Sequence, residues 1–500
     1  MKIWGFGLIC VFSASLANAS TINATSCNQP QVATAISSAN NGDTIVIPAG
    51  TCTWTTTLTV SKSVTLQGQG VNSTIIVDGT TAPSSGAKPP AIQWTVSSNA
   101  LNRLTGITFD GGSVGGQDNS THAGIVSVNG GGNSLRLDHL TFNNLNRTVG
   151  VQVMGNVTGV IDHVIFNIGS HYGLYVFHDN WQGVGGYGDN SWAQPNTFGT
   201  GNFLFVEDCQ FLGPSGSGIS WGSDGWMGQR VVYRRNSYVN VLWANHGTET
   251  SGRERSARAA EVYQNSFALN NGGWNSQLCC LNSVIGLRGG TAMIWGNQLS
   301  GTNGGGARQV FDMANLRSSD SRTFYIFNHC DGTNPWDQNA GPEVGYRCID
   351  QPGAGQGDLL SGDVPAARWL RQQLEPLYIW GNSNNGSLSS GVPNGAIPVM
   401  SNREYYNEVP GFNGTSGMGN GPASARPATC TPGVAYWASD QGEWDSTNGG
   451  APDGVLYKCT SPNTWTLAYT PYQYPHPLVS GGAAPPSAPA PVSPTNLSIQ

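Results

Sequence analysis

Short apolar segments with strand-like alternation recur along most of this chain, and each ends on an aromatic residue or a leucine. Successive end positions are 33, 24, 45, 27, 29 and 32 residues apart, and a second apolar segment lies inside each interval. A repeat of this length with two or three short strands is typical of a solenoid, whose coils stack on one another. The end positions are Phe109, Phe142, Phe166, Phe211, Tyr238, Phe267 and Leu299.

The residues between these segments also favour a solenoid. Asn and Gly recur at the expected corners, where they suit left-handed turns and stacked side-chain ladders. A β-propeller fits less well, because its blades need about 40–50 residues and four strands each. Residues 28–40 have helical spacing at Val32, Ala35 and Ile36, which predicts a helix that caps the open end of the stack.

Composition narrows the class further. The 500 residues include 69 Gly and 28 Pro, and only 10% are charged, with a net charge of −7. This composition excludes a coiled coil and a charge-driven disordered chain. It also lacks the basic footprint of a nucleic-acid-binding protein. We therefore expect a mostly β protein that binds no nucleic acid.

Residues 1–19 have the features of a secretory signal peptide. Lys2 is followed by the apolar run 3–12 and by a small-x-small site that ends at Ala19. The run is too short for a transmembrane anchor, and no later stretch is long enough. We expect a secreted, extracellular protein that has no membrane span and begins at Ser20.

Nine of the ten cysteines follow this leader, and an oxidising compartment favours disulfides between them. Cys209, Cys279 and Cys280 are left over, and the odd number leaves at least one free thiol. A zinc site is disfavoured, because there is no C-x-x-C and no nearby His pair. The spacing suggests the pairs Cys27–Cys52, Cys330–Cys348 and Cys430–Cys459.

The segments 42–70 and Val160-Ile-Asp162-His163 resemble the opening coils and a strand motif of secreted right-handed parallel β-helix proteins of the pectate-lyase-like superfamily. The resemblance covers residues 25–410 and implies an all-β fold. We expect a signal peptide at 1–19, a right-handed parallel β-helix with its N-terminal capping helix at 20–421, a small disulfide-closed β-hairpin module at 422–478 and a Pro/Ala/Ser-rich tail at 479–500.

The densest polar cluster is segment 245–258, with one His, two Glu and three Arg. Pectate lyases carry an Arg-rich segment just before a V-x-x-N-x-aromatic strand, and there an arginine removes the proton α to a uronate carboxylate. Here Arg255 and Arg258 precede strand 262–267 in a similar order, although Ala257 replaces the usual proline. The resemblance therefore implies a base role for Arg253 or Arg255, with Arg258 beside the reacting sugar.

The chemistry of β-elimination leaves a second assignment open. The reaction needs a base near the C5 proton and a cation that neutralises the uronate carboxylate. His246 with Arg288 is the alternative pair. A structural alternative has equal weight, in which the arginines bridge Glu249, Glu254 and Glu261 across stacked coils.

Candidate substrate-binding residues come from strand alternation and from one insertion. If Leu242 and Ala244 point inward, then Trp243 and Asn245 point outward and can contact the substrate. Asp224 and Glu249 are further predicted substrate contacts. The insertion 179–196 adds aromatic residues that suit sugar stacking or packing of the loop itself. Asp179 and Asp189 could hold Ca²⁺, although no EF-hand or RTX-type pattern is present. The aromatic residues of the insertion are Trp181, Tyr187 and Trp192.

Three functions follow, and the first is preferred. The first is a monomeric secreted polysaccharide lyase that cleaves a uronate-containing chain. The second is an inverting glycoside hydrolase, which needs two carboxylates from among Asp224, Glu249 and Asp312. The third is a non-catalytic carbohydrate-binding or surface β-helix. Asp138 and Asp162 occupy equivalent places in adjacent repeats, which favours a structural ladder over a catalytic pair.

Overall fold

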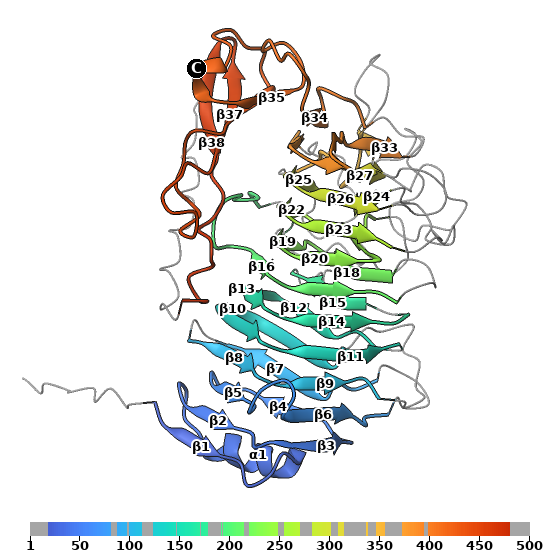
Figure 1. Cartoon of the computed structure of the whole chain (residues 1–500), viewed down its shortest axis with the longest axis vertical. Coiled ribbons are helices and arrows are strands. Elements are labelled where there is room, and N and C mark those ends of the chain that lie inside the picture. Colours follow the sequence, from blue (N-terminus) through green and yellow to red (C-terminus); the bar gives the residue numbers. More distant parts are fainter. Residues whose placement is uncertain are drawn as a thin grey trace, which may run out of the picture.

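The computed structural model shows a parallel β-helix, as the repeats predict (Figure 1). It describes residues 19–81, 88–97, 100–112, 124–146, 148–170, 172–178, 192, 194–214, 220–248, 255–270, 283–301, 309–314, 337–338, 347–355, 373–394 and 399–480. The strands form three parallel sheets, here called A, B and C, and each coil contributes a strand to sheet C, then to sheet A and then to sheet B. Strands in successive coils pair in parallel, so equivalent residues form rows along the solenoid axis.

The three sheets have the following strands. Sheet A contains β1 (Thr21–Asn23), β2 (Thr44–Val46), β5 (Thr65–Gln67), β8 (Asn102–Thr105), the second half of β10 (Val126–Asp138), β13 (Asn156–Asp162), β16 (Leu204–Glu207), β19 (Arg230–Arg234), β22 (Ala259–Tyr263), β25 (Thr291–Trp295), β30 (Leu377–Trp380) and β34 (Tyr405–Asn407). Sheet B contains β3 (Gly50–Trp54), β6 (Thr74–Asp78), β9 (Thr108–Asp110), β11 (Thr141–Leu145), β14 (Ile165–Ile168), β17 (Gln210–Leu212), β20 (Ser237–Val239), β23 (Ser266–Leu269), β26 (Gln298–Gly301), β31 (Ser383–Asn384) and the antiparallel β32 (Ser387–Leu388). Sheet C contains β4 (Leu58–Val60), β7 (Ile92–Val96), the first half of β10, β12 (Val151–Met154), β15 (Tyr172–Phe177), β18 (Ser220–Trp226), β21 (Val241–Ala244), β24 (Ser283–Leu287), β27 (Gln309–Ala314) and β33 (Val392–Asn394).

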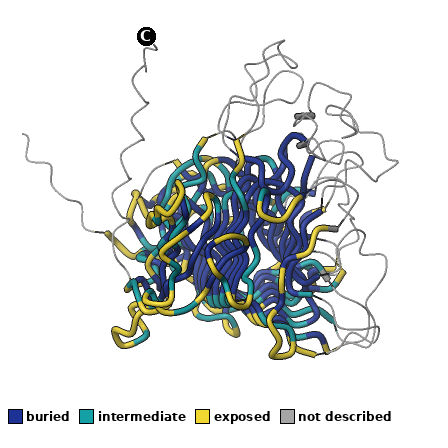
Figure 2. The backbone as a smooth tube through the Cα atoms, turned by 90° about the horizontal axis from the view of Figure 1, so that it is seen from above, coloured by how far each residue is buried: buried dark blue, intermediate teal, exposed yellow. Residues whose placement is uncertain are grey.

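The aromatic residues that end the repeats form a stacked column inside the solenoid. Phe109, Phe142 and Phe166 stack with ring centroids 5.3 Å apart at each step. The column continues with Phe211, Tyr238 and Phe267, and every ring is at most 1% exposed. Seen along the axis, buried segments fill the interior and exposed segments lie at the periphery (Figure 2).

The corner between sheets A and B explains the recurring Asn and Gly. Residues there adopt a positive φ, as in Gln264 (φ 55°) and Gly296 (φ 64°). The next residue points inward, and four of these form an asparagine ladder. Each Asn side chain donates to the Oδ1 of the next, for example from Asn265 to Asn297 at 2.9 Å. The ladder comprises Asn236, Asn265, Asn297 and Asn382.

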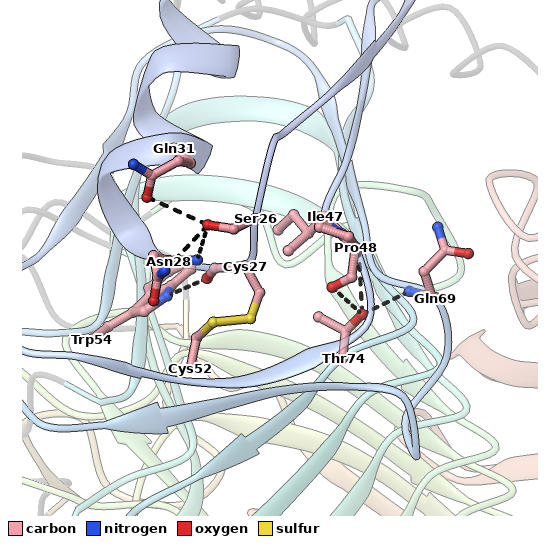
Figure 3. The surroundings of a disulfide bond; sticks show 10 residues. All are labelled: Ser26, Cys27, Asn28, Gln31, Ile47, Pro48, Cys52, Trp54, Gln69 and Thr74. Carbon is pink, nitrogen blue, oxygen red and sulfur yellow. Dashed lines mark hydrogen bonds between the residues drawn. A yellow bond between two sulfur atoms is a disulfide. The ribbon is translucent and has the colours of Figure 1, made fainter.

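The N-terminal end of the solenoid is capped as expected. Helix α1 (Gln29–Ser38) buries Val32, Ala35 and Ile36 against the first coils. The Cys27–Cys52 disulfide ties the segment before α1 to β3 (Figure 3). Lys62 Nζ donates to the carbonyl oxygens of Ile36, Ser37 and Ala39, which lie at the C-terminal end of the helix and favour a cation.

The C-terminal region packs on the outer face of sheet A. Strands β35 (Met418–Gly421), β36 (Ala435–Ala438), β37 (Val455–Ser461) and β38 (Thr464–Tyr469) form a four-stranded sheet, and a short 3-10 helix, η2 (Ala423–Ala425), lies between β35 and β36. The ring centroid of Trp437 lies 4.9 Å from that of Trp295 and 5.0 Å from that of Trp380. Residues 470–480, here called the strap, then run back along sheet A towards the earlier coils (Figure 1).

The strap makes its contacts with buried charged groups. Arg234 donates to the carbonyl oxygens of Tyr472 and Gln473, and Arg136 donates to that of Leu478. The ladder expected at Asp138 and Asp162 is present in the same face. Arg103 pairs with Asp138 at 2.7 Å, and Arg136 pairs with Asp162 at 3.0 Å.

The Cys27–Cys52 and Cys430–Cys459 pairings are confirmed. Cys348 is also disulfide-bonded, and its predicted partner Cys330 lies outside the described residues, as do Cys279 and Cys280. Cys209 is free and buried. In the part of the chain that the structure describes, no helix has the length and apolar character needed to cross a membrane. The antiparallel pair β28 (Asp337–Gln338) and β29 (Arg347–Cys348) completes the described elements.

Candidate functional site

The side chains of Asp224 and His246 meet on the outer face of sheet C. Ser223 pairs in register with the core residue Leu174, so the next residue, Asp224, points outward. The Nδ1 atom of His246 lies 2.5 Å from Asp224 Oδ1, and both side chains are at least nine-tenths buried. Because a carboxylate accepts hydrogen bonds, Nδ1 carries the hydrogen and Nε2 keeps its lone pair in the neutral ring.

A second buried histidine near the same edge of sheet C is arranged differently. His178 Nε2 donates to the carbonyl oxygen of Val157 at 2.8 Å, and its Nδ1 accepts the Arg230 N–H at 2.8 Å. Burial lowers the pKa of His178 to about 3, and the charge of Arg230 acts in the same direction. His178 is therefore held as a neutral ring between two backbone groups, whereas His246 is paired with a carboxylate, which is the arrangement that supports proton transfer.

Arg288 is attached to the residue that precedes His246. Its Nε donates to the carbonyl oxygen of Asn245 at 2.9 Å, and its backbone N–H donates to Asn245 Oδ1 at 2.8 Å. Arg288 follows β24 and Asn245 follows β21, which are neighbouring strands of sheet C. The register therefore brings a guanidinium next to the Asp224–His246 pair from the following coil.

Asp312 lies on the same outward row as Asp224 but farther along the axis. Strand pairing traces this row: Asp312 pairs with Gly286, and Gly286 pairs with Ala244. Ala244 follows Trp243, which pairs with Ser223, so Ala244 lies opposite Asp224. Three strand spacings thus separate the two aspartates, or about 14 Å between backbones. Between them the row carries only the methyl group of Ala244 and the hydrogen of Gly286.

Arg255 and Arg258 occupy a different environment from the one that a catalytic base requires. Arg255 forms two hydrogen bonds with Asp350, at 2.6 and 2.9 Å, and its side chain is 1% exposed. Arg258 pairs with Glu375 at 2.9 Å and is fully buried. The structure places both arginines in the bridging role that the sequence left as an alternative, with Asp350 and Glu375 as partners. Glu249 and Glu254 lie outside the described residues, and Glu261 bonds to the Gly199 N–H and the Tyr469 hydroxyl.

Trp192 is held between these arginines. The guanidinium carbons of Arg255 and Arg258 lie 4.2 and 5.2 Å from its ring centroid, and its Nε1 donates to the Ser256 carbonyl. The indole is fully buried. This differs from the predicted sugar contact, because cations and backbone already pack against the ring.

Trp243 and Asn245 are also corrected. Trp243 pairs with Ile285 and packs edge-on against Tyr233 in the core, so its side chain points inward. The cause is a register shift between Trp221 and Ser223, which simple alternation cannot anticipate. Asn245 is 1% exposed and bonds to Arg288, so it is a buried hydrogen-bond partner rather than an outward-facing contact residue.

Several predicted site residues lie outside the described residues. They are Arg253, Glu249, Trp181 and Tyr187, together with the calcium candidates Asp179 and Asp189. In the described part of the chain, no group of three or more His, Cys, Asp or Glu residues is arranged to hold a metal ion.

The sequence analysis missed the aromatic residues that surround Asp224. Tyr175 pairs with Asp224, Phe177 pairs with Trp226, and Trp226 lies edge-on to His246 with ring centroids 5.6 Å apart. A usable signal was present, because aromatic residues recur at alternate positions in 175–177, where outward-facing rows are usually polar. The partners Asp350 and Glu375 had no such signal, because they are about 95 and 117 residues from the arginines that they bind.

Comparisons with known proteins add a structural likeness only. No protein-family model and no curated protein matches the chain. Among solved structures, an alginate lyase from Paenibacillus sp. str. FPU-7 is similar at 16% identity with a TM-score of 0.33. The match covers 56% of this chain and 95% of that one.

Proposed function

We propose that this protein is a secreted polysaccharide lyase that cleaves a uronate-containing polysaccharide by β-elimination, with His246 as the base. The observation that carries the proposal is the connection Asp224–His246–Asn245–Arg288 on the outer face of sheet C. It supplies an oriented imidazole and a guanidinium within one pair of coils, which are the two groups that the reaction needs.

The reaction follows from these positions. His246 Nε2 takes the C5 proton of the uronate, and Asp224 stabilises the resulting imidazolium through Nδ1. Arg288 neutralises the uronate carboxylate, so negative charge can build up there as C5 loses its proton. The C5–H electrons form the C4–C5 double bond, the C4–O bond breaks, and the leaving oxygen takes a proton from water.

For the carboxylates that the structure describes, the geometry favours the hydrolase alternative less; Glu249, its third candidate, lies outside the described residues. An inverting hydrolase needs carboxyl groups roughly 6.5–9.5 Å apart. Asp224 and Asp312 stand three strand spacings apart, about 14 Å between backbones. Asp224 is also bonded to His246, which favours the charged carboxylate rather than a protonated acid.

The test is incubation of the protein with alginate, polygalacturonate and other uronate polysaccharides. Ultraviolet absorbance detects the unsaturated product, and a reducing-end assay detects every cleavage. We expect both signals together, and His246→Ala to lower kcat roughly 10²–10⁴-fold. His139→Asn is the matched control, because His139 also bonds an aspartate through Nδ1 but lies on the corner of sheet A. Reducing ends without absorbance would indicate hydrolysis. The absence of both signals would rule out both activities.

A further inference from the structure

One buried ion pair of the solenoid contains a lysine. Only four of the 22 Lys and Arg residues are lysines, and Lys88 Nζ contacts Oδ2 of Asp78, with the two side chains 6% and 0% exposed. The other ion pairs between described side chains use arginine or histidine as the base. A guanidinium always stays charged, whereas a buried lysine amine can lose its proton and act as a nucleophile. Lysine at this position therefore permits a reaction with its partner that arginine does not.

The Lys88–Asp78 pair lies at the base of the connection from β6 to β7. Buried and half-buried positions alternate along β6, and Asp78 ends the strand on the buried side, in register with the core residue Trp54. Lys88 stands at the other end of the connection, shortly before β7 begins at Ile92. The pair therefore joins the two ends of this connection inside the solenoid, away from water.

Thr80 links the amine to the carboxyl group. Its Oγ1 lies 2.7 Å from Lys88 Nζ and 2.7 Å from Asp78 Oδ1, and its backbone N–H donates to the same Oδ1 at 3.1 Å. The hydroxyl is also 2.8 Å from the carbonyl oxygen of Pro89. It has one hydrogen to donate and can accept two. When it donates to Pro89, its other two contacts are satisfied by a neutral Lys88 amine and a protonated Asp78, both donating to Oγ1.

The neutral forms of both groups are the reactive ones, and burial favours them as a pair. Two buried charges cost free energy that a neutral acid and a neutral amine avoid. The interior also keeps Lys88 Nζ, Thr80 Oγ1 and the Asp78 carboxyl group in contact, which replaces a bimolecular encounter by a fixed geometry.

We propose that Lys88 and Asp78 form an intramolecular isopeptide bond after the chain has folded. The Nζ lone pair bonds to Cγ of the protonated Asp78, and Nζ passes one proton to Thr80 Oγ1, which gives its own proton to Oδ1. The Cγ–Oδ1 bond breaks, water leaves with that electron pair, and Oδ2 becomes the amide oxygen. The condensation consumes no oxidant and no further reactant.

The bond adds a second kind of cross-link to the N-terminal coils. The Cys27–Cys52 disulfide already ties the segment before α1 to β3, and β3 pairs in parallel with β6. A covalent tie restricts the unfolded chain in the same way as a disulfide does. The isopeptide bond differs in that reducing agents do not cleave it, so the early coils keep one tie after reduction.

Peptide mapping of the denatured and reduced protein tests the proposal. Trypsin cuts after Lys62 and Arg103 but not at Lys88, which precedes a proline, so peptide 63–103 holds both reacting residues. We expect this peptide to be lighter than its sequence by one water molecule, and its fragment spectrum to lack backbone ions between residues 78 and 88. The full sequence mass would overturn the proposal and leave an ion pair alone.

Lys88→Arg is the matched control, because it keeps the positive charge and cannot form the bond. Its peptide 63–103 should have the full sequence mass. Asp78 is followed by Gly79, and cyclisation at an Asp–Gly step also releases water. A loss of water that persists in Lys88→Arg would assign the loss to that step and overturn the proposal. If the variant fails to fold, fragment ions inside 78–88 in the parent protein would overturn it equally.

Thr80→Val tests the proton relay, because it keeps the side-chain volume and removes the hydroxyl. In pulse-labelled protein, the bonded form of peptide 63–103 should accumulate roughly 10²-fold more slowly than in the parent protein. An equal rate in the two proteins would overturn the role of Thr80.

Discussion

The outer faces of sheets A and C carry the same kinds of side chain but use them differently. On sheet A, Arg234 pairs with Glu207 at 2.6 Å and bonds to the strap, and Tyr469 of the C-terminal sheet donates to Glu261. On sheet C, the connection from Asp224 to Arg288 runs across coils beside the buried rings of Tyr175 and Trp226. The buried charged clusters of this chain are therefore of two kinds: ion pairs covered by a segment that is distant in the sequence, and hydrogen-bonded groups that join neighbouring coils.

Arg255 and Arg258 belong with the first kind. Each is buried against a carboxylate from a distant part of the chain, at Asp350 and Glu375. These ion pairs join the segment before β22 to residues 95 and 117 positions further along the chain. The smaller cluster at His246 and Arg288 is the one to which we assign the proposed proton abstraction.

The largest effect on stability should come from removing a covered charge on sheet A. Arg234→Ala leaves Glu207 buried without its guanidinium, and we expect a loss of about 3–5 kcal/mol in the free energy of unfolding. Chemical denaturation measures the loss, and the activity of the remaining folded protein should be unchanged. Arg103→Ala is the matched control. The Arg103 side chain is 31% exposed, so its removal should lower the free energy of unfolding much less. Equal losses would contradict the role given to the strap.

The next effect depends on pH. Burial raises the pKa of Glu261 from 4.5 to about 7, against hydrogen bonds from the Gly199 N–H and the Tyr469 hydroxyl. The folded state therefore holds this proton more tightly, and stability falls as pH rises from 4.5 through 7. In the unmodified protein this proton makes the free energy of unfolding about 3 kcal/mol lower at pH 8 than at pH 4, and Glu261→Gln should abolish that difference. Melting curves of the unmodified protein and the variant at the two pH values measure this difference. Equal changes of melting temperature with pH in the two proteins would contradict the prediction.

A histidine of the strap should show the opposite pH dependence. Burial lowers the pKa of His476 from 6.5 to about 3, helped by the charges of Arg234 and Arg136. The unfolded chain takes up this proton first, so stability is lost as pH falls below 6.5. His476→Asn should reduce that loss by up to about 1.4 kcal/mol per pH unit, measured by denaturation between pH 6.5 and 4. A slope equal to that of the unmodified protein would contradict this environment.

The smallest effect is expected at the exposed histidine stack on the corner of sheet A. His139 and His163 stack with ring centroids 5.1 Å apart, and their side chains are 59% and 47% exposed. His139→Asn keeps a residue that tolerates the positive φ of 49° and should change stability by less than about 0.5 kcal/mol. Activity should stay within twofold. A large loss of activity would place function on sheet A and reverse the comparison.

Much of the fold was predictable because its signals are local and repeated. The aromatic column, the Asn corners and helix α1 all follow from spacing, since each coil repeats the same inward positions. The site was only partly predictable. The sequence analysis named His246, Arg288 and Asp224, which the structure brings together on neighbouring coils, and their roles stay predictions. It assigned Trp243 to the wrong face, because the register shift at 221–223 leaves no mark in the sequence. The arginine partners are distant in the chain, so their pairing depends on tertiary structure.

The strap changes what kind of folding unit the solenoid is. A stack of coils with neighbour-only contacts is quasi-one-dimensional, and its ends can unravel independently. The hydrogen bond from Arg136 to Leu478 joins residues 342 positions apart. The ladder charges on sheet A acquire this cover only when the strap docks. We therefore expect the middle coils and the C-terminal sheet to melt in one cooperative transition rather than coil by coil.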